Sequence, residues 1–383
     1  MNGQKTIGFA GTLEIFLLTI LTFSPLIPRI ISIPVIFLMI LCGLWHLLKD
    51  RTAASVETSF IILILFFIIS MTLDVINTLS GEPYSIVNFL YPVYFVCGYF
   101  VAKKYDRDEF YTALEKITFI FAILSLVGMS VYFINPSWIY SFPTYTHNDS
   151  THHTIFFFNY LFSGTWMSVR NCGMAWEPGA FQILLNIAFQ VSIQTHEKKK
   201  LFFRVCIYTL AIILTRSTIG YVILAINIVS LLKKHKKYIP LAFIALALGI
   251  AFIIPEIMYQ IEYKLFGSHA FNARFEPMVN AIKSSWYRPF GMGSTEYNKI
   301  YESARLGSYD CYTQILLRFG YPVLLLVMAR LFKIFRRDNK CIAIILLISF
   351  LSEPIWGSTL ISAMYYLDSK GLEVREDDLA RIE

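Results

Sequence analysis

Four arginines stand in two long loops and in one short turn between apolar segments, where a phosphate group would be a natural ligand. They are Arg170, Arg216, Arg274 and Arg288. The guanidinium group is planar and forked, so it can donate two parallel hydrogen bonds to the oxygens of one phosphate. Several arginines on one membrane face therefore indicate a site for an anionic lipid headgroup, with a diphosphate as the natural candidate.

Two acidic residues, Glu177 and Asp310, stand at predicted helix starts beside these arginines. If the diphosphate is a leaving group, arginines can neutralise the negative charge that develops on it. A nearby carboxylate can accept the proton of an attacking hydroxyl group. This combination predicts glycosyl transfer from a lipid carrier. The sequence contains no P-loop and no DxD-type metal pair, so the donor need not be a sugar nucleotide, and we expect no metal or other cofactor.

The passage from Arg170 to Pro178 leads into an apolar segment that carries amide side chains at steps of four: Gln182, Asn186, Gln190 and Gln194. This spacing places the amides on one helical face. An unpaired amide is costly in hydrocarbon, so the face should meet protein or a water-filled cavity. One interpretation is a helix-packing seam. The other is the wall of an outward-facing cavity lined by Gln182 and Asn186, which Arg170 and Glu177 at its mouth favour.

The composition indicates a membrane protein. Charged residues make up 15% of the chain and hydrophobic residues 56%, whereas soluble proteins have about 25% charged residues. The net charge of +7 comes from short Lys and Arg clusters between the apolar segments. Cytoplasmic loops collect such residues, so the clusters mark the inner face. A nucleic-acid partner is not needed to explain them.

The apolar segments predict about twelve membrane crossings with both termini in the cytoplasm. Five come first: Phe9–Ile27, Ile30–Leu48, Thr58–Leu79, Ser85–Ala102 and Ile117–Ile134. After the amide-bearing helix, two short runs of about 14 to 16 residues meet at Leu214–Thr218, and each spans only about 21 to 24 Å. This is less than the roughly 30 Å of a bilayer core. We therefore expect Arg216 to lie in a recess below the outer surface.

Further spans are predicted at Tyr238–Pro255 and Tyr312–Leu331. The last apolar stretch, Cys341–Leu367, is either one long helix or two short helices broken at Ser352–Pro354, and we favour two. The sequence thus predicts one all-α polytopic membrane domain over residues 1–383. Its other parts are two large outer loops, 135–175 and 256–310, and a charged tail, 368–383.

Two smaller patterns have simple explanations. His147, His152 and His153 match no zinc signature, so we expect a solvated loop there. Glu-Pro pairs occur on the predicted outer side, beginning at Glu82, Glu177, Glu276 and Glu353. Proline suits the first turn of a helix and an acidic neighbour suits its positive end. Helix starts therefore explain these pairs, and we expect a further role only for Glu177.

The order of these pieces resembles the O-antigen polymerase and O-antigen ligase superfamily of bacterial envelopes, with its Wzy-type polymerases. The matching pieces are Arg170–Pro178, Leu214–Ser217, Arg274 with Trp286 and Pro289–Gly293, and Asp310–Gly320. The resemblance implies a helical, GT-C-like membrane fold in the bacterial inner membrane. It also implies a metal-independent glycosyltransferase that joins undecaprenyl-diphosphate-linked glycans, donor and acceptor, at the periplasmic face.

The resemblance also implies roles for single residues. In family members, arginines matching Arg216 and Arg274 engage the donor diphosphate. Ligases carry a histidine about eleven residues before the glycine matched by Gly320, whereas this chain has Tyr309, a cavity-lining candidate, followed by Asp310. This departure favours a polymerase, with Asp310 or Glu177 as base and a chain-length regulator protein as a further partner. The alternatives are a ligase acting on lipid A core or protein, and a polysaccharide flippase or transporter, which would be expected to carry charge throughout both halves.

Overall fold

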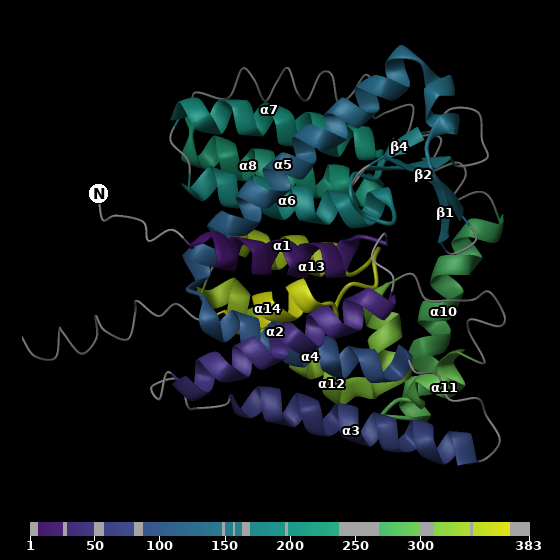
Figure 1. The fold of residues 1–383 in the computed structure, drawn as a ribbon. Coiled ribbons are helices and arrows are strands. Elements are labelled where there is room, and N and C mark those ends of the chain that lie inside the picture. The colour runs from purple at the N-terminus through teal and green to yellow at the C-terminus, as the bar shows by residue number, and fades with distance from the viewer. Residues whose placement is uncertain are drawn as a thin grey trace, which may run out of the picture.

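The computed structural model describes residues 7–25, 29–49, 57–79, 87–147, 150–155, 158–162, 169–195, 198–236, 268–298, 310–337 and 340–367. Most helices lie side by side along one common direction, and a small sheet and a transverse helix, α10, lie at one end (Figure 1). We call this the outer end and the opposite end the inner end. In the described ranges, three helices are long and apolar enough to cross a membrane: Thr58–Ile76, Arg107–Ile134 and Cys311–Arg336. The protein is a helical membrane protein.

The first five predicted spans are all helices. Their bounds are α1 (Phe9–Phe23), α2 (Arg29–Lys49), α3 (Thr58–Leu79), α4 (Val87–Lys104) and α5 (Arg107–Ile134). Asp106 is the N-cap residue of α5, and its carboxylate accepts a hydrogen bond from the Arg107 N–H at 2.8 Å. This contact satisfies one of the backbone donors that every helix leaves unpaired in its first turn.

The amide-bearing segment is α6 (Pro178–Thr195), and the predicted short pair follows as α7 (Lys198–Thr215) and α8 (Thr218–Lys234). The turn between α7 and α8 lies where the sequence predicts it. With 18 and 17 residues, these helices extend about 27 and 26 Å, less than a roughly 30 Å bilayer core. Ser217 caps α8, because its hydroxyl oxygen accepts the Gly220 N–H at 3.3 Å.

The first outer loop corrects the all-α prediction. It contains a 3-10 helix, η2 (Pro136–Ser141), and four strands, β1 (Thr144–His147), β2 (Ser150–Ile155), β3 (Phe158–Phe162) and β4 (Val169–Asn171). The strands form an antiparallel sheet in the order β1-β2-β3-β4. Threonine and aromatic residues favour strands, and His147 pairs with Ser150. Only two residues separate that pair, the length of a tight hairpin connection.

The second outer loop contributes α10 (Ser268–Tyr287) and the short α11 (Gly293–Tyr297) before α12 (Cys311–Arg337). Helix α10 runs across the ends of the other helices and covers part of the outer end (Figure 1). The predicted span Tyr238–Pro255 and the tail 368–383 lie outside the described residues.

The last apolar stretch is two short helices, α13 (Lys340–Ser349) and α14 (Thr359–Tyr366). At the outer end, the Cys311 N–H at the start of α12 donates to Phe350 O at 2.8 Å. At the inner end, the Tyr366 ring packs edge-on against Tyr99 in the last turns of α4, with ring centroids 5.0 Å apart. The chain therefore runs outward in α13 and returns in α14, which confirms the preferred alternative of two helices.

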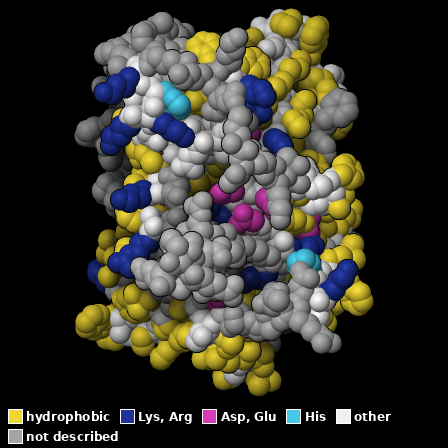
Figure 2. Space-filling view, turned by 90° about the vertical axis from the view of Figure 1, so that its left-hand side faces the viewer, with side chains coloured by type: hydrophobic (Ala, Val, Ile, Leu, Met, Phe, Trp, Pro, Cys, Tyr) yellow, Lys and Arg dark blue, Asp and Glu magenta, His cyan; other side chains and the backbone are white. Residues whose placement is uncertain are grey.

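Lysine and arginine side chains gather on the inner end, which Figure 2 shows face-on, with acidic side chains between them. Glu57, just before α3, contacts three cations: Lys103 at 2.9 Å, Arg330 at 2.6 Å and Lys333 at 3.3 Å. Burial alone would raise the pKa of Glu57, but the Lys103 hydrogen bond and the three positive charges together lower it to about 2. This ionised carboxylate joins α3, α4 and α12.

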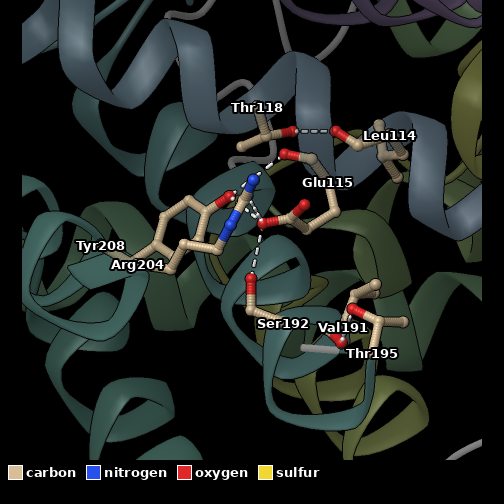
Figure 3. A network of polar contacts seen from close by, with 8 residues as sticks. All are labelled: Leu114, Glu115, Thr118, Val191, Ser192, Thr195, Arg204 and Tyr208. Carbon is tan, nitrogen blue, oxygen red and sulfur yellow. Dashed lines mark hydrogen bonds and ion pairs between the residues drawn. The ribbon is translucent and has the colours of Figure 1, made fainter. Parts of the chain in front are cut away.

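A second buried carboxylate joins three helices that pack side by side. Glu115 of α5 has no exposed surface, and its Oε1 accepts hydrogen bonds from Ser192 of α6 at 2.6 Å and Tyr208 of α7 at 3.0 Å. It also forms an ion pair with Arg204 of α7 (Figure 3). The Arg204 guanidinium lies 4.1 Å from the centroid of the Phe119 ring. Both charges of the pair are therefore compensated within the bundle.

Replacing Glu115 with Ala should destabilise the purified protein by about 3 kcal/mol, because Arg204, whose side chain is only 16% exposed, would keep its charge without its carboxylate. Glu115→Gln retains hydrogen-bonding groups and should cost less. Thermal unfolding in detergent measures both changes. Asp108→Asn is the control, because the Asp108 side chain is 72% exposed in its ion pair with Arg107. Equal stability of the Glu115→Ala and Asp108→Asn variants would contradict the structural role of Glu115.

Candidate functional site

Arg170, on β4, uses its guanidinium group to hold the turn between α7 and α8. Its Nε donates to Thr215 O at 3.1 Å and its Nη2 donates to Arg216 O at 2.9 Å. The fork that could bind a phosphate is thus directed at two consecutive backbone carbonyls. The structure brings the predicted pair Arg170 and Arg216 together, with Arg170 supporting the backbone of Arg216.

Arg216 has an unusual backbone conformation. Its φ of 51° makes it the one residue other than glycine with a positive φ in the described part of the chain. A side chain in this left-handed region costs of order 1 kcal/mol or more and persists only where surrounding contacts fix it. The bonds from Arg170 and the bond from the Arg216 N–H to Ile213 O, at 3.1 Å, supply those contacts. Its side chain is half-buried.

The passage before α6 is held by a buried asparagine, Asn171. Asn171 Nδ2 donates to Ser125 Oγ at 3.1 Å and Ala211 O at 3.2 Å, and Asn171 Oδ1 accepts the Gly173 N–H at 3.0 Å. Gly173 has a φ of +50°, and a Cβ there would lie 2.3 Å from the Phe181 ring. Only glycine fits this turn. The passage is therefore a fixed platform between α5, α7 and α6.

Glu177 is the last residue before α6. Its Oε1 accepts the indole N–H of Trp176 at 3.0 Å, and the Trp176 ring stacks on Phe23 at the end of α1, with centroids 6.1 Å apart. Glu177 is half-buried, and its carbonyl accepts the Phe181 N–H at 3.2 Å. It thus lies at the positive end of the α6 dipole, where a carboxylate is stabilised.

The sequence predicts only a helix start at Glu353, and this prediction is wrong. Glu353 lies in the connection between α13 and α14 and is 5% exposed. A Cβ built on Gly179, in the first turn of α6, would lie 1.8 Å from Glu353 Oε1. The carboxylate therefore fills the space beside the Gly179 backbone that a side chain would occupy. The sequence feature that could have indicated this buried carboxylate is the Glu353-Pro354 pair inside an apolar stretch.

Asp310 lies next to a second residue that contacts Glu353. It caps α12, since its Oδ1 accepts the Thr313 N–H at 2.7 Å, and the next residue, Cys311, donates from Sγ to Glu353 O at 2.8 Å. Burial raises the pKa of Asp310 above its ordinary value, although hydrogen bonds from Thr313 and Tyr312 oppose the rise. Glu353 thus lies against Gly179, two residues after Glu177, and accepts a hydrogen bond from Cys311, the residue after Asp310.

The amide face of α6 meets α8. Asn186 Nδ2 donates to Gln182 Oε1 at 2.9 Å, Asn227 Nδ2 of α8 donates to Asn186 Oδ1 at 2.9 Å, and Gln190 Nε2 donates to Ser230 Oγ at 3.2 Å. Gln182 and Asn186 are both fully buried. The contacts found are those of the helix-packing seam, which was the first of the two interpretations.

Of the remaining predicted residues, the structure describes the side chain of Arg288 alone. Arg288, just after α10, forms an ion pair with Glu296 of α11 at 2.5 Å, with 46% of its side chain exposed. Arg274 belongs to α10, but its side chain lies outside the described residues, as does the whole of Tyr309. The structure therefore places Arg288 at the outer end with an acidic partner and leaves the roles of Arg274 and Tyr309 as predictions.

A buried arginine and a buried aspartate fix α11 beneath this region. Arg318 of α12 is 3% exposed. Its Nη2 donates to Asn298 Oδ1 at 3.0 Å, and its guanidinium lies 4.2 Å from the Tyr297 ring centroid. Asp74 of α3 accepts the Thr295 N–H at 2.9 Å. Both were lone ionisable residues in apolar segments, a pattern that itself marks important positions in membrane helices.

The Pro289–Gly293 passage packs on a break in α12. Gly320 has φ 75° and ψ −172° inside that helix, so nearby backbone groups lose their helical partners. The passage replaces them: the Met292 N–H donates to Leu317 O at 2.8 Å and the Tyr321 N–H donates to Pro289 O at 2.9 Å. A Cβ on Gly320 would lie 2.1 Å from Pro289 O. The absence of a side chain at Gly320 thus allows the backbone of the Pro289–Gly293 passage to contact the backbone of α12.

The histidines of the first outer loop belong to the sheet. The His152 ring stacks on Tyr145 with centroids 4.8 Å apart, and the His153 ring packs edge-on against Tyr140 at 5.6 Å. Among the described residues, no group of three or more His, Cys, Asp or Glu side chains could hold a metal ion.

A comparison of the sequence with protein-family models finds no match, and a comparison with curated proteins finds none either. The site is therefore interpreted from its own geometry. Among the described residues, the candidate site consists of the turn at Arg216, the carboxylates around the start of α6, and the Pro289–Gly293 passage that packs against Gly320.

Replacing Gly320 with Ala should lower the stability of the purified protein by about 2 kcal/mol, because its conformation is nearly exclusive to glycine. The added methyl group would also push the Pro289–Gly293 passage away from α12, so limited proteolysis should cut that passage faster. Gly8→Ala is the matched control, since a Cβ there meets nothing within 4 Å. Thermal unfolding and proteolysis that do not distinguish the two variants would show that the passage is not held by this contact.

Proposed function

We propose that the protein polymerises oligosaccharide repeat units carried on undecaprenyl diphosphate. It transfers the growing glycan from its lipid carrier to a new lipid-linked repeat unit at the outer face of a bacterial inner membrane. The product is O-antigen or a related envelope polysaccharide. The proposal includes a GT-C-like arrangement of about twelve crossings, and a chain-length regulator protein as a further partner.

The observation that carries the proposal is the strained turn at Arg216. A residue with a side chain in the left-handed region is retained where surrounding contacts fix it, and such residues cluster at functional sites. Here the fixing contact is itself an arginine, whose two donors are used on the carbonyls of Thr215 and Arg216. This geometry supports Arg216 as a ligand of the lipid diphosphate and Arg170 as its positioning residue.

The carboxylates support the chemical step. The acceptor hydroxyl attacks the anomeric carbon of the donor, the bond from that carbon to the diphosphate oxygen breaks, and the hydroxyl proton passes to a carboxylate. Asp310 suits this role because burial raises its pKa and makes it a stronger base. The leaving diphosphate takes the bonding electrons, and its charge is neutralised by Arg216 and, in the proposal, Arg274 and Arg288.

The first test is polymerisation of a purified lipid-linked repeat unit by the purified protein, read as a ladder of products. Arg216→Lys should reduce the rate roughly 100-fold, since lysine keeps the charge but lacks the fork. Arg170→Lys should reduce the rate roughly tenfold and also lower thermal stability, because it loses one of two backbone bonds. Arg107→Lys, at the inner end in the ion pair with the exposed Asp108, should retain wild-type activity.

Deletion of the gene distinguishes the alternatives. A polymerase mutant should carry envelope glycan with single repeat units, whereas a ligase mutant should accumulate long lipid-linked polymer. A mutant that lacks a flippase should leave repeat units on the cytoplasmic face. A wild-type chain-length distribution in the deletion strain, or full activity of Arg216→Lys in the purified system, would refute the proposal.

The pH dependence tests Asp310. A base must be ionised, so activity should fall as the pH drops through the Asp310 pKa, which lies above its ordinary value because of burial. The pH profile of kcat/KM should therefore show an acidic limb above the range of an exposed aspartate. Asp310→Asn should lose most activity, and Asp310→Glu should retain some activity with the limb displaced. An unchanged limb in Asp310→Glu would assign it to another group.

A further inference from the structure

A groove that the proposed reaction does not use lies between α8 and α13. Its volume is about 840 Å³, within the range of roughly 300 to 1,000 Å³ that is typical of ligand sites. Most of its lining is apolar, and its polar groups come mainly from one end of α8. The lining residues are Val222, Ala225, Ile226, Val229, Ser230, Lys233, Lys234, Cys341 and Ile344.

The polar end of the groove carries a fixed positive charge. Lys234 Nζ donates to Ile193 O at 2.9 Å and to Gln194 O at 3.3 Å, at the end of α6. These two bonds use two of the three donors of an ammonium group. They hold the charge at the negative end of the α6 dipole. The neighbouring Lys233 is exposed, so a second cation stands at the same end of the groove.

The rest of the groove suits a hydrocarbon chain. Val222 and Val229 are 50% and 52% exposed, and they lie on the wall that leads away from the lysines. The hydroxyl of Ser230 accepts a hydrogen bond from Gln190 Nε2 at 3.2 Å, so its oxygen already has a donor. A ligand of this groove therefore needs a long apolar part and an anionic group at one end.

We infer that the groove binds an anionic phospholipid of the inner leaflet, with an acyl chain along α8 and the headgroup phosphate at Lys233 and Lys234. Charge complementarity decides the occupant. The lysines lie at the end of the bundle where basic side chains gather (Figure 2), and the cytoplasmic leaflet is rich in anionic lipids that attract such residues. A zwitterionic lipid would fill the apolar wall equally well but would gain less from the two cations.

The test uses purified protein in nanodiscs that contain phosphatidylglycerol or phosphatidylcholine, each with a photoactivatable diazirine in one acyl chain. Crosslinked residues are mapped by mass spectrometry. The anionic probe should label α8 and α13 within the groove more strongly than the zwitterionic probe, by about fivefold for each lysine that contacts the phosphate. Lys233→Gln should lower the labelling by the anionic probe and leave that by the zwitterionic probe unchanged.

Matched variants separate a lipid site from general lipid contact. Val229→Trp should fill the groove and reduce labelling of Cys341 and Ile344 by both probes. Leu325→Trp, on a 67% exposed position of α12, and Lys116→Gln, at an exposed position of α5, should change neither. Equal labelling by the two probes would overturn the headgroup assignment. Labelling that Val229→Trp does not reduce would show that no acyl chain occupies the groove and would overturn the proposal.

Discussion

An ionised side chain in an apolar interior is stable only when its charge is compensated, and the described helices are arranged around such compensated charges. Glu115 joins α5 to α6 and α7 through Ser192, Tyr208 and Arg204. Glu57 joins α3, α4 and α12 at the inner end. In lipid the hydrophobic effect does not select one helix neighbour over another, because lipid tails are as apolar as leucine. These polar contacts therefore help to decide which helices are adjacent.

Much of the helical plan follows from the sequence because it depends on local properties. Apolar length predicts the first five helices, the basic residues at both ends of the two short runs predict the turn at Arg216 between them, and Ser352–Pro354 predicts the break between α13 and α14. The sheet could not be predicted in the same way. Its threonine and aromatic residues also suit a membrane interface, and a strand is fixed by a partner strand that local composition does not specify.

The sequence predicts which residue types form the candidate site, but it does not predict which partners their side chains contact. An arginine near the outer end can bind a phosphate or a carbonyl, and the partners of Arg170 are 45 and 46 residues further along the chain. Glu353 shares its Glu-Pro pair with Glu177, which does precede a helix, but Glu353 lies in the connection between α13 and α14, where its carboxylate packs on Gly179 of α6. Arg318 and Asp74 did carry a local signal, since each is an isolated ionisable residue within an apolar segment.

The unusual backbone conformations are not spread evenly over the bundle. Within the described ranges, residues with positive φ are Gly173, Arg216, Gly291, Gly293 and Gly320. They belong to the passage before α6, the turn between α7 and α8, the passage that leads from α10 into α11, and the break in α12. The regular helices beneath them are stabilised by packing and buried charges, so they can support irregular backbone at one end. Four of the five positions are glycines, which adopt this conformation at little cost. Arg216 alone keeps a side chain there, and the bundle supplies Arg170 to hold it. A residue that served only to reverse the chain could be glycine, so the guanidinium group at this position is the feature on which the proposed diphosphate site depends.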